Sequence, residues 1–152
     1  MKTLFILITS VGLLIGSADA QQVKPDAITG TWLVQDGSAK IQIQNLNGKY
    51  CGKIVWIKQP NDKNGKPLLD SKNPDKTLQS RPQIGLLLLS GFVYEENNLW
   101  SDGTIYDPDG GKTYNCKISM KNNNEMDVRG YVGISLFGRT ETWARSQNLA
   151  NN

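Results

Sequence analysis

The sequence predicts an all-β protein, a small antiparallel up-and-down barrel of about eight or nine strands. From residue 114 to residue 121 apolar and polar residues alternate strictly, with Tyr114, Cys116, Ile118 and Met120 on one face. A period of two is typical of a half-buried antiparallel strand. Similar short segments recur at the spacing typical of barrels and sandwiches, and hairpin-length turns join almost all of them. Closing the sheet into a barrel would remove both of its exposed edges.

The N-terminus predicts export. A short positive start, Met1 to Thr3, precedes the apolar run Leu4 to Gly16, and Ala18-Asp19-Ala20 then supplies small residues for cleavage. The run is about 13 residues long, whereas a membrane span needs about 20, so a membrane anchor is the weaker interpretation. We therefore expect a signal peptide over residues 1–20, a single barrel domain over residues 21–152, and a periplasmic or secreted protein with no integral membrane segment after cleavage.

The composition of the chain argues against several classes of function. The net charge is +3 and there is no histidine. The basic residues are scattered among acids rather than concentrated in a stripe, which argues against nucleic acid as a partner. The lack of histidine removes the Ser-His and Cys-His nucleophile arrangements and the commonest metal ligand. No cofactor is predicted, and the oligomeric state is left open.

The first half of the barrel should comprise Gly30 to Gln35, Ser38 to Gln44 and Lys49 to Lys58. Asn47-Gly48 between the last two is a strong hairpin signal, since both positions tolerate positive φ. Gly52 suggests a bulge or bend within its strand. In an exported protein Cys51 and Cys116 are expected to form a disulfide, and two separate buried thiols are the alternative.

The segment from Gln59 to Gln83 interrupts the strand pattern with four prolines. Asn73-Pro74-Asp75 has an N-cap side chain followed by proline, so we expect a short helical turn over residues 74–79. The segment is either a functional lid or a surface excursion. Ile84 to Tyr94 is then expected to be a strand covered on both faces, with a buried helix as the alternative.

The second half begins with a hairpin over Trp100 to Met120, whose corner is Tyr106-Asp107-Pro108-Asp109-Gly110. Proline and glycine suit a tight turn there. A calcium loop starting at Asp107 fails because its twelfth position is Ile118 rather than glutamate, so no metal site is predicted. Met126 to Tyr131 and Arg139 to Arg145 complete the strands.

Two terminal segments resemble the calycin pattern, Gly30-Thr31-Trp32 at the first strand and Arg-Thr-Glu-Thr-Trp-Ala-Arg, residues 139–145, at the last. In lipocalins and fatty-acid-binding proteins an early Gly-x-Trp meets an Arg or Lys from the last strand, which closes the base of the barrel. The resemblance implies that Arg145 or Arg139 stacks over Trp32.

Nearly the whole mature chain also resembles an uncharacterised family of exported bacterial proteins, a domain of unknown function with a lipocalin-like barrel. That resemblance implies a fold and a compartment but no catalytic residues. The segments that carry it are Gly30–Trp32, Gly52–Ile54, Arg81-Pro82, Ile84–Leu86, Trp100, Gly103–Pro108, Gly111–Tyr114, Arg129–Tyr131 and Gly138–Trp143.

Aromatic rings and two arginines are the candidate ligand-binding side chains, because small-ligand pockets combine apolar walls with a few polar groups. They are Trp32, Trp56, Trp100, Tyr106, Tyr114, Arg129, Tyr131, Arg139 and Trp143. The rings could instead fill a barrel that has no void, and the arginines could stack on Trp32 or pair with acids on neighbouring strands.

The leading hypothesis is a non-enzymatic binder of a small hydrophobic or amphipathic ligand. One alternative is a cell-envelope structural or interaction protein with a filled barrel. The weaker alternative is a hydrolase using paired carboxylates, for example Asp107 with Glu141 or Asp127.

Overall fold

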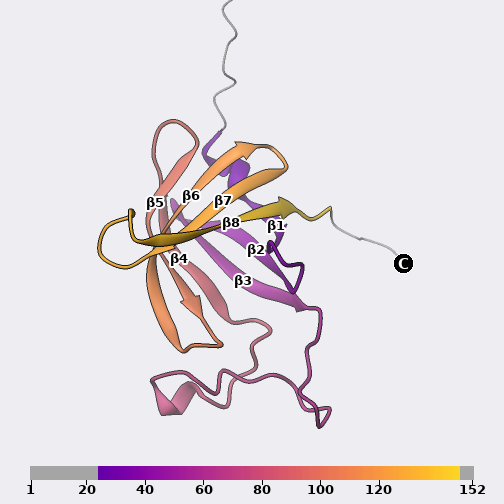
Figure 1. Cartoon of the computed structure of the whole chain (residues 1–152). Coiled ribbons are helices and arrows are strands. Elements are labelled where there is room, and N and C mark those ends of the chain that lie inside the picture. Colours follow the sequence, from indigo (N-terminus) through magenta and orange to yellow (C-terminus); the bar gives the residue numbers. More distant parts are fainter. Residues whose placement is uncertain (1–23, 148–152) are drawn as a thin grey trace, which may run out of the picture.

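The computed structural model describes residues 24–147, so the predicted signal peptide lies outside the described residues. Eight antiparallel strands form a closed barrel in which each strand pairs with the next and the last pairs with the first, as Figure 1 shows. The predicted up-and-down barrel is confirmed. Its strands are β1 (Gly30–Leu33), β2 (Ala39–Leu46), β3 (Lys49–Ile57), β4 (Leu87–Tyr94), β5 (Leu99–Asp107), β6 (Lys112–Asn122), β7 (Glu125–Tyr131) and β8 (Gly138–Arg145).

The up-and-down order sends alternate connections to opposite ends of the barrel. One end carries the short β2–β3, β4–β5 and β6–β7 turns together with the 3-10 helix η1 (Pro25–Ile28). The other end carries the β1–β2, β5–β6 and β7–β8 loops and the long segment 58–86, which contains the 3-10 helix η2 (Lys76–Leu78). Figure 1 shows η1 and η2 at opposite ends. We call these the closed end and the mouth.

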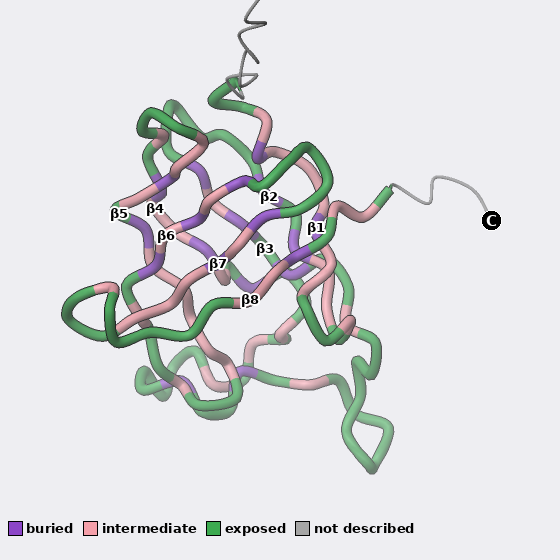
Figure 2. The backbone as a smooth tube through the Cα atoms, turned by 45° about the horizontal axis from the view of Figure 1, so that its top comes forward, coloured by how far each residue is buried: buried purple, intermediate pink, exposed green. Residues whose placement is uncertain are grey.

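The hydrophobic core fills the closed end and the middle of the barrel. Along each strand, buried residues alternate with more exposed ones, and Figure 2 shows this alternation in the tube. The largest fully buried side chains are Trp32, Trp100, Trp143 and Phe92. The predicted inward face of β6 is confirmed, because Cys116, Ile118 and Met120 are all buried.

The β2–β3 turn has the predicted conformation. Asn47 and Gly48 have φ values of 56° and 85°. Positive φ at both central residues is the type I′ geometry, whose twist matches that of the flanking strands.

Bulges shift which residues of β3 face inward. Ile41 pairs with Ile54 but Lys40 pairs with Trp56, so Val55 is an extra residue in β3. An extra residue reverses the in–out order beyond it, and Trp56 therefore faces outward. A second irregularity in the pairing lies at Gly52, where the sequence suggested a bulge or bend, but the extra residues there belong to β4 rather than to β3.

The expectation that β4 is covered on both faces is wrong. Leu89 and Phe92 are buried, whereas Leu87 and Val93 are exposed. The two buried positions are three residues apart because Gly91, at φ 75°, lies in a bulge opposite β3. The apolar run is thus a one-sided strand with exposed apolar residues on its outer face.

The expected disulfide is absent, and both cysteines are free. Tyr50 and Gly52 face the interior, so Cys51 between them faces outward, whereas Cys116 is buried inside the barrel. Strands β4 and β5 separate β3 from β6. Because the two side chains lie on opposite faces of the barrel wall and two strands apart, no bond can form without moving backbone.

Candidate functional site: the barrel cavity and its rim

A cavity of about 960 Å³ extends from the barrel interior to the open mouth, where the rim loops also line it. Its walls are more apolar than polar, and the buried side chain of Trp143 lies among them. Five strands supply large aliphatic side chains to the lining, namely Ile41, Ile54, Ile57, Leu88, Ile105 and Val128. The cavity can therefore exclude water from an apolar guest.

Charged groups gather where the cavity meets solvent. Lys58 and Arg139 supply cations, and Asp36, Asp107, Asp109 and Glu141 supply carboxylates. The guanidinium Nη2 of Arg139 lies 3.4 Å from a carboxylate oxygen of Glu141, and the Arg139 side chain is 84% exposed. A ligand at the mouth can therefore contact both positively and negatively charged groups, above an apolar interior.

Arg145 seals the closed end. Its guanidinium carbon lies 4.2 Å from the centre of the Trp32 ring. The guanidinium donates to the carbonyl oxygens of Ala27 (2.6 Å), Thr29 (2.9 Å) and Asn123 (2.5 Å). The Trp32 indole N–H donates to the carbonyl of Ile28 at 2.8 Å. The resemblance left Arg145 and Arg139 open, and Arg145 performs the closure.

Gly30 makes room for this closure. A Cβ at Gly30 would lie 2.8 Å from Nη1 of Arg145, and the residue has φ 120°, which side chains rarely adopt. The Gly-x-Trp pattern therefore has a steric reason in this chain, since the glycine clears the space that the guanidinium occupies.

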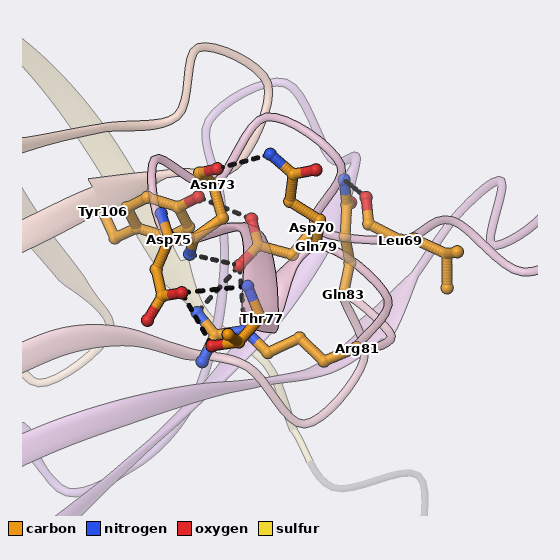
Figure 3. A network of polar contacts seen from close by, with 9 residues as sticks. All are labelled: Leu69, Asp70, Asn73, Asp75, Thr77, Gln79, Arg81, Gln83 and Tyr106. Atoms are coloured by element: carbon orange, nitrogen blue, oxygen red, sulfur yellow. Dashed lines mark hydrogen bonds and ion pairs between the residues drawn. The ribbon is translucent and has the colours of Figure 1, made fainter.

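A buried carboxylate fastens the long segment to the barrel (Figure 3). Asp70 is fully buried, and its oxygens accept hydrogen bonds from the Tyr106 hydroxyl (2.5 Å), the Asn73 amide (2.8 Å) and the Arg81 guanidinium Nε (2.8 Å). Arg81 also forms an ion pair with Asp70 at 2.8 Å. Tyr106 belongs to β5, so this network links segment 58–86 to the wall of the barrel.

The network shifts two ionisation equilibria. Burial by itself raises the pKa of Asp70, but the hydrogen bonds from Tyr106, Asn73 and Arg81 outweigh it and hold the pKa below its usual value. Burial and the hydrogen bond to Asp70 raise the pKa of Tyr106 to about 12. The pair is therefore a carboxylate accepting from a neutral phenol at neutral pH.

The helical turn in this segment is shorter than expected and has a different cap. The helix η2 covers three residues, Lys76 to Leu78. Asp75 rather than Asn73 caps it, since its carboxylate accepts from the Thr77 N–H at 2.9 Å. Asn73 instead accepts from the Asp75 N–H and donates to Asp70. Leu68 and Gln83 from the same segment line the cavity, so the segment forms part of the rim.

Comparison with known proteins agrees with this fold. The family described as "Uncharacterized protein conserved in bacteria (DUF2147)" matches residues 30–145. The chain belongs to this family. No curated protein matches the chain. Among solved structures, the Helicobacter pylori protein HP1028, whose title places it in the lipocalin family, is similar with a TM-score of 0.71 and 21% identity, covering 79% of this chain and 83% of that one.

The DUF2147 barrel brings five of the nine candidate residues to the cavity. Tyr106, Tyr114, Tyr131, Arg139 and Trp143 line it. Their role in binding stays a prediction.

The other four candidates lie elsewhere. Trp32 is beneath Arg145 at the closed end, and Trp100 is buried there between the rings of Tyr50 and Tyr94. Trp56 faces outward, with the Lys40 ammonium 5.3 Å from its ring centre. The guanidinium of Arg129 donates hydrogen bonds to backbone carbonyls of the β7–β8 loop.

Proposed function

We propose that the protein is an exported, non-enzymatic binding protein that holds a small, partly apolar ligand in its barrel. The observation that supports this most is the cavity of about 960 Å³. Small-molecule sites are concave, mostly apolar and roughly 300–1,000 Å³ in volume. A barrel filled by its own aromatic rings would leave no such space, so the interaction-protein alternative is less favoured.

The distribution of polarity along the cavity indicates an amphipathic ligand. Its apolar part would lie against the aliphatic walls and Trp143. Its polar part would lie at the mouth, near Lys58, Arg139, Tyr114 and Tyr131. Tyrosine suits this position because its ring is apolar and its hydroxyl can donate or accept.

The carboxylates at the mouth have structural partners, which favours binding over hydrolysis. Asp107 accepts from the Asp109 N–H at 3.0 Å as part of the β5–β6 turn. Glu141 accepts from the Trp143 indole at 3.1 Å and pairs with Arg139. Asp127 does not line the cavity and instead pairs with Lys121 at 2.9 Å.

Oleate is a suitable probe, with tryptophan fluorescence as the readout. Because Trp143 is the tryptophan that lines the cavity, we expect oleate to change the emission, and we expect Trp143→Phe to lose most of that change. Ala39→Phe places a ring into the cavity from β2 and should weaken oleate binding about tenfold, equivalent to about 1.4 kcal/mol. Native mass spectrometry of protein purified from the exporting cell would detect a ligand that is already bound.

Ala144→Phe is the matched control, since Ala144 is exposed on β8. It makes the same substitution outside the cavity and should leave oleate binding unchanged. Equal weakening of oleate binding in Ala39→Phe and Ala144→Phe would mean that oleate binds outside the cavity. No emission change and no additional mass in the wild type would overturn the proposed function.

A further inference from the structure

The β7–β8 loop exposes four large apolar side chains. They occupy the six residues 132–137, which we call the apolar loop: Val132 (67% exposed), Ile134 (61%), Leu136 (75%) and Phe137 (69%). A lone exposed apolar residue is ordinary, but a contiguous group on one projecting segment indicates an interaction site. Figure 1 shows this loop extending away from the barrel wall.

Hydrogen bonds hold the apolar loop in this exposed shape. Arg129 donates to the carbonyls of Ser135 (2.7 Å) and Leu136 (3.2 Å). Lys117 donates to the Ser135 hydroxyl at 3.4 Å. Within the loop, the Phe137 N–H donates to the carbonyl of Ile134 at 3.1 Å. The polar groups turn towards the barrel, so the apolar side chains are left facing solvent.

Two cations lie side by side at the base of the loop. Lys117 and Arg129 occupy directly paired positions on β6 and β7. Among residues 24–147, neither belongs to an ion pair. Like charges at paired positions destabilise a sheet unless a counter-charge lies near. An anionic surface against this face would supply that charge.

The loop also borders the mouth of the cavity. Val132 and Phe137 line the cavity, whereas Ile134 and Leu136 do not. The loop therefore has an inner pair facing the cavity and an outer pair, Ile134 and Leu136, available to another surface.

We propose that the apolar loop docks the protein on an anionic lipid bilayer. The outer pair, Ile134 and Leu136, enters the interface between headgroups and acyl chains, and the positive charge of Lys117 and Arg129 beneath the loop attracts anionic headgroups. Burial of apolar side chains combined with attraction to anionic lipid is the general basis of reversible binding at membrane interfaces. Docking of this kind does not depend on a guest in the cavity.

Sedimentation with sucrose-loaded vesicles tests the proposal. One set of vesicles contains phosphatidylcholine alone, and the other contains phosphatidylcholine with phosphatidylglycerol. The variant is Ile134→Ser with Leu136→Ser, which leaves the cavity lining intact. The matched control is Leu46→Ser with Leu87→Ser, which removes two exposed apolar side chains from the outer wall. Lys117→Gln tests the contribution of charge.

We expect the wild type and the control to sediment with the phosphatidylglycerol vesicles and the loop variant to bind them about tenfold more weakly. Lys117→Gln should lose affinity for these vesicles but not for phosphatidylcholine. An unchanged melting temperature and unchanged oleate binding in the loop variant would separate lost docking from lost folding and from failure of the proposed function.

Three results would overturn the proposal: a wild type that stays in the supernatant, a loop variant that sediments as well as the wild type, or equal binding to both vesicle compositions. A wild-type dimer that the loop substitutions abolish, without vesicle binding, would also overturn it, because the occupant of the loop would then be a second copy of the chain.

Discussion

The guanidinium of Arg145 lies over the ring of Trp32, 4.2 Å from its centre, and these two residues are also backbone partners between the first and last strands. The same guanidinium donates to three backbone carbonyls, two in the segment before β1 and one in the β6–β7 turn. One side chain thus joins the first strand, the last strand and a hairpin at the closed end of the barrel.

Arg145→Met should lower the free energy of unfolding by about 2–4 kcal/mol, because hydrogen bonds from a charged donor contribute roughly 1.5–3 kcal/mol and the carbonyls lose their donor. Urea denaturation followed by tryptophan fluorescence measures this. Arg139→Met is the control, since Arg139 is largely exposed and should change stability by about 0.5 kcal/mol or less. Equal effects of the two substitutions would contradict the assignment of the closure to Arg145.

Asp70 should make part of the stability depend on pH. Its folded pKa is lowered, so the carboxylate stabilises the fold above the unfolded pKa of about 3.9, and this contribution is lost as pH falls through the folded value. Asp70→Asn should lower the free energy of unfolding by about 2–4 kcal/mol at pH 6. The gap between wild type and variant, meaning the difference in their free energies of unfolding, should close as the pH falls below about 4.

Urea denaturation at a series of pH values measures that gap. Taking the difference cancels the other carboxylates, which are common to both proteins. Asp102→Asn, at an exposed position on β5, should show no such gap. A gap between wild type and Asp70→Asn that stays constant down to pH 2 would show that the ionised carboxylate is not what stabilises the fold.

Gly111 should be essential for packing the long segment against the β5–β6 turn. A Cβ at this position would lie 1.9 Å from the carbonyl oxygen of Lys72, and the residue has φ 67°. Gly65, with φ 76° and open space around it, gives a matched control within the long segment itself. Both Gly→Ala changes incur backbone strain of about 1 kcal/mol, and only Gly111→Ala adds a clash.

We expect trypsin to cut the segment, which contains Lys63, Lys72 and Lys76, much faster in Gly111→Ala than in Gly65→Ala. Equal cleavage rates in the two variants would mean that the segment does not pack on the turn as described.

The sequence predicted the barrel well because barrel strands depend on local alternation, which is visible along β6 from Tyr114 to Met120. It misplaced Trp56, because one bulge residue, Val55, reverses the orientation of the side chains after it, and composition does not locate bulges. It missed Asp70 because a lone acid in a long irregular segment resembles any solvated residue, and only folding brings Tyr106 to it. Arg81-Pro82, a conspicuous pair in the resemblance, was the available signal.

The two cysteines should differ sharply in reactivity. Cys116 is fully buried, and burial raises the pKa of its thiol to about 12, so both access and thiolate formation are suppressed. Cys51 is partly exposed on the outer face. A thiol-reactive dye should therefore label Cys51 in the native protein and Cys116 only after unfolding.

The two cysteines should also differ in their contribution to stability. Cys51→Ser should change the free energy of unfolding by about 0.5 kcal/mol or less, whereas Cys116→Ser, which puts a hydroxyl in the core, should lower it by about 1–3 kcal/mol. Intact mass under non-reducing conditions is the control, because a disulfide would lower the mass by two hydrogen atoms and block both sites. That result would require β3 and β6 to lie together, which the strand order of the barrel forbids.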